Sequence, residues 1–292
     1  MFDTHCHLNF QAFDKNLDAV VKEARETGVR HIVVPSTDLA SSKKAVEIAK
    51  RFDDVYAAVG IHPHHIYKFQ ISPLDKLRVM VSKVEPSNSK FQINDEIKKI
   101  EKLLQNPKVV AVGEIGVDRY YYRKTKYTDY QVTGEFIDLQ KKILRQQIEL
   151  AVKYKKSLIL HNREAKQDLL KVLGEVGGFG ELERRVVFHC CEPEEELLTF
   201  AKEKGIFIGV DGDVTYNRKK QEFVKRIPKD MLVLETDSPF LIPEPLRSQN
   251  IFPNTPKNLT IIAEYLSQHL RVSLQELTNT TTKNAKALFR IL

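Results

Sequence analysis

The sequence predicts an α/β fold, a (β/α)8 barrel with an extra helix after its last unit. Eight short apolar, strand-like runs alternate with longer amphipathic runs along the 292 residues, and eight such units favour a closed barrel over an open sheet. Runs such as VVAVG (109–113) are apolar throughout, as expected of strands covered on both faces. In addition, side chains that bind metals end several of these runs, and a parallel barrel brings its strand ends to one rim.

The expected strands are short and apolar, whereas the expected helices show a longer amphipathic pattern. The strands cover residues 2–8, 31–37, 55–62, 108–116, 157–162, 185–190, 205–210 and 231–237. The helices cover residues 14–27, 39–51, 134–155, 164–176, 193–204, 219–226, 256–269 and 273–289. Pro193 and Pro256 fit the first turns of their helices, where the N–H that proline lacks has no intrahelical partner.

Two segments are longer than a minimal barrel requires. Residues 67–94 are polar, and we expect a helix over 74–84 and a surface excursion over the rest. Residues 119–133 leave the rim just after the strand that carries Glu114. Because no repeat, low-complexity tract or clean linker divides the chain, we expect one domain that spans residues 1–292.

Composition and charge narrow the class of protein. Hydrophobic residues make up 42% of the chain, and the net charge of +7 favours an anionic partner only weakly, since such a charge also serves solubility. The three cysteines, Cys6, Cys190 and Cys191, predict no disulfide framework, which fits a reducing compartment. The N-terminus has no signal-peptide pattern, and no apolar run approaches a membrane span. We therefore expect a cytoplasmic protein without membrane contact.

Six side chains with metal-binding chemistry share one structural position, the carboxyl end of an expected strand. They are His5, His7, Glu114, His161, His189 and Asp237. His5 and His7 lie two positions apart, so on a strand both point to one face and can chelate one ion. Imidazole and carboxylate together suit zinc, manganese and similar ions. Each residue alone has an ordinary explanation as a core histidine, an ion-pair partner or a turn former, but six in one chain favour a metal site.

These motifs together resemble the TatD family of metal-dependent hydrolases, within the amidohydrolase-like barrels. The segments that carry the resemblance are DTHCHL (3–8), GIHPH (60–64), GEIGVD (113–118), HNR (161–163) with Ala165, HC (189–190), Gly212 with Thr215, ETDSP (235–239), and Asn284 and Ala285 with Leu288 and Phe289. The resemblance implies metal-dependent hydrolysis of DNA, commonly as an exonuclease. Two loops that contact substrate depart from the family pattern, at 191–193 and 253–256, so the choice of substrate stays open.

The resemblance also implies two divalent ions, with zinc, magnesium and manganese as candidates. It divides the six side chains into ligands of one ion, ligands of the other ion, and a carboxylate that bridges both. In that order, they are His5, His7 and Asp237; His161 and His189; and Glu114. We expect two of them to be catalytic, because Glu114 would hold the ions close while Asp237 would orient a water and accept its proton.

Three further residues near these ligands are candidates for substrate binding. Arg163 follows His161 by two positions, so its planar fork could hold a phosphate, although an ordinary surface ion pair explains it equally well. His62 and His64 share a face at the end of the third strand and could contact substrate or support the ligands. A proline-containing turn with solvated histidines is the alternative for this pair.

The segment RYYYRKTKYTDY (119–130) interleaves aromatic and basic residues. Tyrosines such as Tyr120 and Tyr121 would stack on splayed bases while basic groups follow the phosphates, which fits a single-stranded or frayed DNA end. The alternative is a lid whose tyrosines pack on the barrel. The sequence indicates no obligate protein partner.

Three functions are compatible with these residues. A metal-dependent deoxyribonuclease is the leading hypothesis. The second is a hydrolase of another bond, such as the ester of D-aminoacyl-tRNA or a small cyclic amide, because the same ligands can serve attack on carbon or on phosphorus. The third, a non-catalytic barrel that binds nucleic acid, is disfavoured because all six ligand positions are filled.

Overall fold

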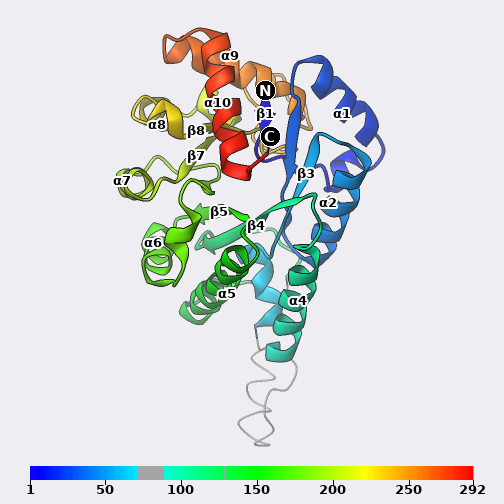
Figure 1. Cartoon of the computed structure of the whole chain (residues 1–292), viewed down its shortest axis with the longest axis vertical. Helices are drawn as coiled ribbons and strands as arrows, with labels where there is room; N and C mark the ends of the chain where they lie inside the picture. Colours follow the sequence, from blue (N-terminus) through cyan, green and yellow to red (C-terminus); the bar gives the residue numbers. More distant parts are fainter. Residues whose placement is uncertain (71–88, 128, 292) are drawn as a thin grey trace, which may run out of the picture.

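The computed structural model describes residues 1–70, 89–127 and 129–291. Its strands form one eight-stranded sheet in chain order, and every neighbouring pair is parallel. The strands are β1 (Phe2–Asp3), β2 (His31–Val34), β3 (Val55–Val59), β4 (Val109–Asp118), β5 (Ser157–Arg163), β6 (Val186–Phe188), β7 (Phe207–Val210) and β8 (Leu232–Leu234). Helices surround this sheet (Figure 1), which confirms the expected (β/α)8 barrel.

Backbone hydrogen bonds join the first and last strands just beyond their ends. The Asp237 amide donates to the His5 carbonyl at 2.9 Å, and the His7 amide donates to the Ser238 carbonyl at 2.7 Å. Between these bonds, Cys6 forms a parallel bridge with Ser238. We call this junction the β1–β8 seam; it consists of the segments that carry three of the expected metal ligands.

The helices pack apolar stripes on the sheet, and four of the α-helices described begin at side-chain caps. They are α1 (Leu17–Glu26), α2 (Leu39–Arg51), α4 (Ser89–Leu103), α5 (Gly134–Lys153), α6 (Lys166–Glu175), α7 (Glu195–Lys204), α8 (Arg218–Val224), α9 (Leu259–His269) and α10 (Leu274–Phe289). Asp38 and Ser41 form a reciprocal capping box at α2, Thr133 and Ser273 cap α5 and α10, and α8 also has a side-chain cap. Among the described helices, none combines the length and the apolar character needed to cross a bilayer.

The expectation for residues 67–94 is wrong at its C-terminal end, where α4 begins. Ile93, Ile97, Ile100 and Leu104 are all buried, and their spacing of three or four residues is that of one helix face. The polar residues between them hid this stripe in the sequence. The helix expected over 74–84 lies outside the described residues.

Several helix starts also differ from the expected ones. A short 3-10 helix, Gln11–Phe13, precedes α1, which therefore begins at Leu17. Pro193 is not in the first turn of a helix, because α7 begins only at Glu195. Pro256 does lie in the first turn of a helical segment, as expected. That first turn is a 3-10 helix, Pro256–Asn258, and α9 itself begins directly after it at Leu259.

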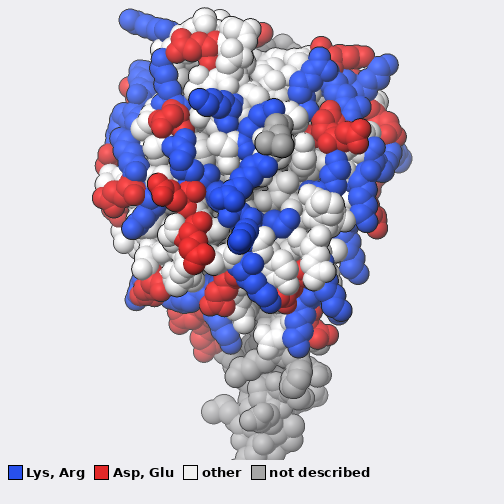
Figure 2. All heavy atoms as spheres, viewed as in Figure 1, with Lys and Arg blue, Asp and Glu red and all other residues white. Residues whose placement is uncertain are grey.

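One layer of the barrel interior takes a residue from each strand, and α10 covers it at the amino-terminal end. Phe2, Val33, Ala58, Ala111, Ile159, Val187, Phe207 and Val233 form one buried cluster with Ala285, Leu288 and Phe289. The rings of Phe2 and Phe289 stack at 5.8 Å. The face over which α10 runs is shown in Figure 2, where Lys and Arg side chains gather near the middle. This basic area thus lies away from the carboxyl ends of the strands.

Candidate metal centre

Side chains that are far apart in the sequence meet at the carboxyl end of the barrel. Five of the expected ligands line a cavity of ≈ 820 Å³, namely His7, Glu114, His161, His189 and Asp237. The sixth, His5, is fully buried beside them, with its Nε2 atom 3.5 Å from Glu114 Oε2 and 3.7 Å from Asp237 Oδ1. The structure therefore brings together all six residues, an arrangement that a shared metal centre requires.

The pair His5 and His7 is positioned by the β1–β8 seam and not by a long strand. β1 ends at Asp3, whose carboxylate accepts a hydrogen bond from the His5 amide at 3.2 Å. Extended pairing returns only at Cys6, which is fully buried in the apolar core. On either side of Cys6, the two Nε2 atoms of His5 and His7 lie 3.2 Å apart. The alternation expected of residues two apart is kept, although the strand expected over 2–8 is much shorter.

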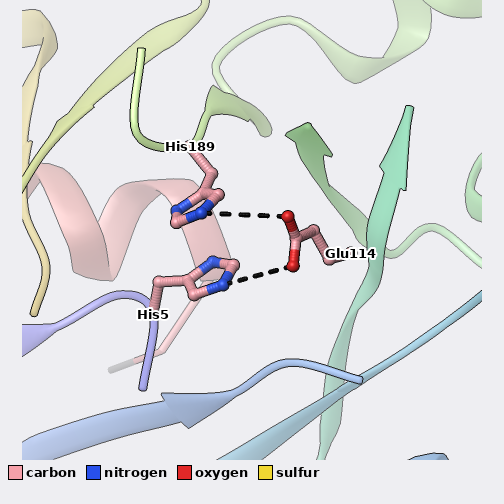
Figure 3. A group of neighbouring side chains, drawn as sticks. All are labelled: His5, Glu114 and His189. Carbon is pink, nitrogen blue, oxygen red and sulfur yellow. Dashed lines mark ion pairs between the residues drawn. The ribbon is translucent and has the colours of Figure 1, made fainter. Parts of the chain in front are cut away.

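Glu114 lies at the centre of the cluster because β4 changes its pairing there. The register of β4 with β5 shifts at this point, and the Glu114 amide donates to the Ser36 carbonyl at 2.8 Å, beyond the end of β2. Its Oε2 atom lies 3.5 Å from His5 Nε2, and its Oε1 atom lies 3.8 Å from His189 Nε2. Figure 3 shows the carboxylate between the two rings, with one oxygen directed to each. This is the geometry that a bridging carboxylate needs.

Three groups of donor atoms within the cluster could each hold an ion. Within each group, the donor atoms lie within 4.8 Å of one another. The groups are His5, His7 and Asp237; His5, Glu114 and His189; and His62, Glu114 and His161. The first group is the one expected for one ion. The other two divide His161 from His189 and add His62, which the sequence suggested only as a supporting or substrate group.

Two buried carboxylates fix the orientation of the imidazoles from behind. Asp118 accepts from His161 Nε2 at 3.0 Å, and Glu235 accepts from His189 Nδ1 at 2.9 Å. One ring nitrogen of each histidine thus faces a supporting carboxylate, and the other faces Glu114, at 2.8 Å for His161 Nδ1 and 3.8 Å for His189 Nε2. With an ion bound, that second nitrogen would present its lone pair to the ion. Sequence reasoning gave these two carboxylates no role. Their only signal was their place in the motifs GEIGVD and ETDSP, next to the expected ligands.

The protonation of the cluster reflects its crowded charges. Burial alone would lower the pKa of His161, but hydrogen bonds to Asp118 and Glu114 outweigh it and raise the pKa to about 10. Burial would raise the pKa of Glu114, yet the surrounding histidines hold it well below its ordinary value. Burial raises the pKa of Asp237 well above its ordinary value. A cation among these groups would replace protons and stabilise both carboxylates in the ionised form, so the donor set fits a metal.

Asp118→Asn is expected to weaken metal binding by roughly 10- to 100-fold, because the amide can no longer fix the His161 tautomer as a carboxylate does. The measurement is a competition titration between the protein and a chromogenic zinc chelator. Asp138→Asn serves as the control, since that carboxylate is on α5 and its side chain is 75% exposed. Equal affinities of the Asp118→Asn variant and the unmodified chain would show that Asp118 does not position the ligand.

Arg163 lies at the rim of the same cavity and is held by two tyrosines. Its guanidinium carbon lies 3.7 Å from the centre of the Tyr120 ring, and its Nη1 atom donates to the Tyr122 hydroxyl at 3.3 Å. Among the described residues, no carboxylate forms an ion pair with Arg163. The surface ion pair considered as the alternative is therefore not what holds this side chain, which lines the cavity.

Several aromatic residues of the 119–133 segment pack on the barrel, and one of them, Tyr122, also lines the cavity. His64 contacts the rings of Tyr122 and Tyr130 at 4.6 and 4.8 Å, and Tyr67 contacts Tyr130 at 4.9 Å. These contacts match the lid considered as the alternative to a stacking surface. Tyr121 differs from them, because its side chain is 58% exposed. His62 and His64 both line the cavity, but only His62 approaches Glu114, with 3.5 Å between Nε2 and Oε1.

A parallel eight-stranded barrel with imidazoles and carboxylates gathered at its carboxyl end is an arrangement typical of one class of protein, the metal-dependent hydrolases. Within that class, residues 2–290 match the family described as TatD related DNase. The chain belongs to this family, as its motifs indicated.

Individual relatives are similar to this chain over nearly their whole length. The chain is 31% identical over 298 residues to YabD of Bacillus subtilis (strain 168), named an uncharacterized metal-dependent hydrolase, with 100% of this chain and 99% of that protein covered. It is 27% identical over 292 residues to the deoxyribonuclease TATDN3 of Homo sapiens, with 99% and 94% covered. The crystal structure of YJJV, a TatD homologue from Escherichia coli K12, is similar with a TM-score of 0.78 at 26% identity, covering 100% and 98%.

Proposed function

We propose that this chain is a metal-dependent hydrolase that cleaves DNA phosphodiesters as an exonuclease, on single-stranded or frayed ends. The observation that carries the proposal is the Glu114 carboxylate, which directs one oxygen to His5 and the other to His189, in a cavity whose rim holds Arg163. Membership of the TatD related DNase family and the deoxyribonuclease name of human TATDN3 support DNA as the substrate.

In this proposal the cluster holds two divalent ions, with zinc, magnesium or manganese as candidates. When bound, they supply positive charge that offsets the charge of the phosphodiester and lowers the pKa of water. The ligands would be His5, His7 and Asp237 for one ion and His161 and His189 for the other, with Glu114 shared and His62 available beside it. Asp118 and Glu235 would keep the two outer histidines in the tautomer that binds.

The protein itself would place the phosphate and take up the proton. Asp237 Oδ1 lies 3.5 Å from His7 Nε2 and 3.8 Å from His189 Nε2, so this carboxylate can orient a water within the cluster and accept its proton. Arg163 would hold a phosphate oxygen through its fork. Because the Arg163 guanidinium already stacks on Tyr120, the side chain would lose little rotamer freedom when it binds a phosphate.

The size of the cavity favours an unpaired strand over duplex DNA. A cavity of ≈ 820 Å³ is in the range of small-molecule sites and matches one or two nucleotides. Glu114, which lines this cavity, is only 4% exposed. We expect a phosphate at a frayed end to reach this carboxylate more readily than a phosphate held within a duplex.

Removal and return of metal ions, combined with a panel of substrates, test the proposal. The protein is stripped with a chelator, reloaded with Zn²⁺, Mn²⁺ or Mg²⁺, and assayed on single-stranded DNA, duplex DNA, RNA, D-aminoacyl-tRNA and bis(4-nitrophenyl) phosphate. We expect no turnover in the stripped protein, recovery with at least one ion, and faster shortening of single-stranded DNA than of blunt duplex. Turnover of the aminoacyl ester without any cleavage of a phosphodiester would overturn the proposal in favour of a hydrolase of another bond.

A further inference from the structure

A second, open groove lies beside the metal centre, and three of its seven lining residues are phenylalanines. It has a volume of ≈ 580 Å³ and is lined by Asn9, Phe10, Gln11, Ala12, Pro239, Phe240 and Phe252. We call it the phenylalanine groove. Phe240 is 47% exposed and Phe252 is 64% exposed, although burial of such rings is normally favourable. None of the lining residues is charged, so the groove has no cation that would attract a phosphate.

The phenylalanine groove is continuous with the cavity of the metal centre. Phe10 and Phe240 line both spaces, and their ring centres lie 5.9 Å apart in an edge-to-face arrangement. Phe10 also stacks on the ring of His7, with 4.3 Å between centres and 20° between planes. The groove therefore begins one ring away from an expected metal ligand.

The loop that carries the two exposed rings is held in place by a buried asparagine. Asn254 is fully buried, and its amide group donates to the Thr236 carbonyl at 3.0 Å and to the Phe240 carbonyl at 2.7 Å. Its backbone amide donates to the Pro239 carbonyl at 3.0 Å. The rings are thus presented by a braced loop, so little ordering is required when a ligand binds.

We infer that the phenylalanine groove binds a nucleobase of the DNA strand whose phosphate lies at the metal centre. This inference rests on the proposed function and adds a subsite to it. Flat, uncharged aromatic faces next to a charged centre match a nucleotide, whose base stacks while its phosphate needs cations. The groove lies at the junction of β1 and β8, and Arg163 lies on β5, half-way round the strand order. A strand could therefore place a phosphate at Arg163 and a base in the groove on the other side of Glu114.

The test measures binding with cleavage blocked by Asp237→Asn in every protein. A dye-labelled short single strand is titrated by fluorescence anisotropy, together with strands in which each of the last three nucleotides in turn lacks its base. We expect Phe240→Ala and Phe252→Ala to weaken binding of the complete strand by roughly five- to 150-fold each. One of the three strands with a missing base should lack the base that occupies the groove. For that strand, we expect the Phe240→Ala and Phe252→Ala substitutions to cause no further loss of affinity. Phe252→Tyr, which keeps the aromatic face, should restore the affinity.

The matched control is Ile251→Ala, on the same loop, with 44% of the side chain exposed and no part in the groove lining. Thermal unfolding and sedimentation velocity are measured for each variant. Unchanged DNA affinity in the Phe240→Ala and Phe252→Ala variants, or a loss of self-association in place of a loss of affinity, would overturn the inference. If the unmodified chain hydrolyses no phosphodiester with any ion, the proposed function itself fails. Failure of the proposed function and failure of the proposed base-binding groove are therefore separate results.

Discussion

Asp237→Asn is expected to reduce turnover of single-stranded DNA by about 10²- to 10⁴-fold, the usual contribution of a general base. The amide has nearly the same shape as the carboxylate, but it cannot accept the proton of the attacking water. The Asp237 backbone has a φ of 49°, a left-handed conformation that asparagine also tolerates well, so the fold should be retained. The measurement is kcat at saturating substrate, with metal content determined on the same sample.

Asp230→Asn provides the matched control, because that carboxylate lies in the chain segment just before β8 and its side chain is 72% exposed. It should have the kcat of the unmodified chain. If the kcat of Asp237→Asn lies within a factor of two of the control at equal metal content, Asp237 is not the general base.

Glu114→Gln is expected to lower both activity and metal content. The buried carboxylate is within 3.8 Å of five histidine nitrogens, those of His5, His7, His62, His161 and His189, and an amide cannot offer two anionic oxygens to two ions. The loss of metal affinity should exceed the roughly 10- to 100-fold loss expected when a residue that only hydrogen-bonds to a ligand, such as Asp118, is substituted. Metal analysis after gel filtration, with circular dichroism to verify the fold, provides the measurement.

The same experiment also tests whether Glu114 is shared between two ions. If it is, the Glu114→Gln variant should bind fewer ions per chain than the unmodified protein at the same free concentration. A variant that keeps the full stoichiometry and loses only turnover would place Glu114 in the chemistry but not in a bridge.

The barrel could be predicted because short apolar runs alternate with longer amphipathic runs along the whole sequence. Metal-binding side chains at the ends of several apolar runs gave a second indication, since a parallel barrel brings its strand ends to one rim. The buried stripe of α4, which runs from Ile93 to Ile100 and continues at Leu104 just after the helix, was missed because its polar neighbours resemble a surface loop. β1 was overestimated for a different reason. Beyond Asp3 the chain bends at Thr4 and turns at Leu8. Between them, only the pairing of Cys6 with Ser238, far away in the sequence, restores a strand-like bridge.

The candidate ligands could be predicted because metal binding restricts residue type, and because strand ends share one rim. The supporting carboxylates Asp118 and Glu235 could not, since their role depends on which nitrogen of a histidine they contact. His62 was undervalued for the same reason, because its proximity to Glu114 arises from the turn after β3 and not from any spacing within β4. The rings of Phe240 and Phe252 gave no signal, because exposure becomes visible only once the loop is folded.

The β1–β8 seam has a consequence for how the chain completes its fold. His5 and His7 are near the first residue, and Asp237 is near the end of the last strand, so an ion bound by all three would join the two ends of the barrel. A ligand that binds only the closed form adds about 2.7 kcal/mol to the free energy of unfolding at a hundred times its Kd, and the thermal midpoint should rise with metal concentration accordingly. A chain that has not yet docked β8 against β1 lacks this ligand set. Hydrolysis would therefore begin only once the barrel has closed.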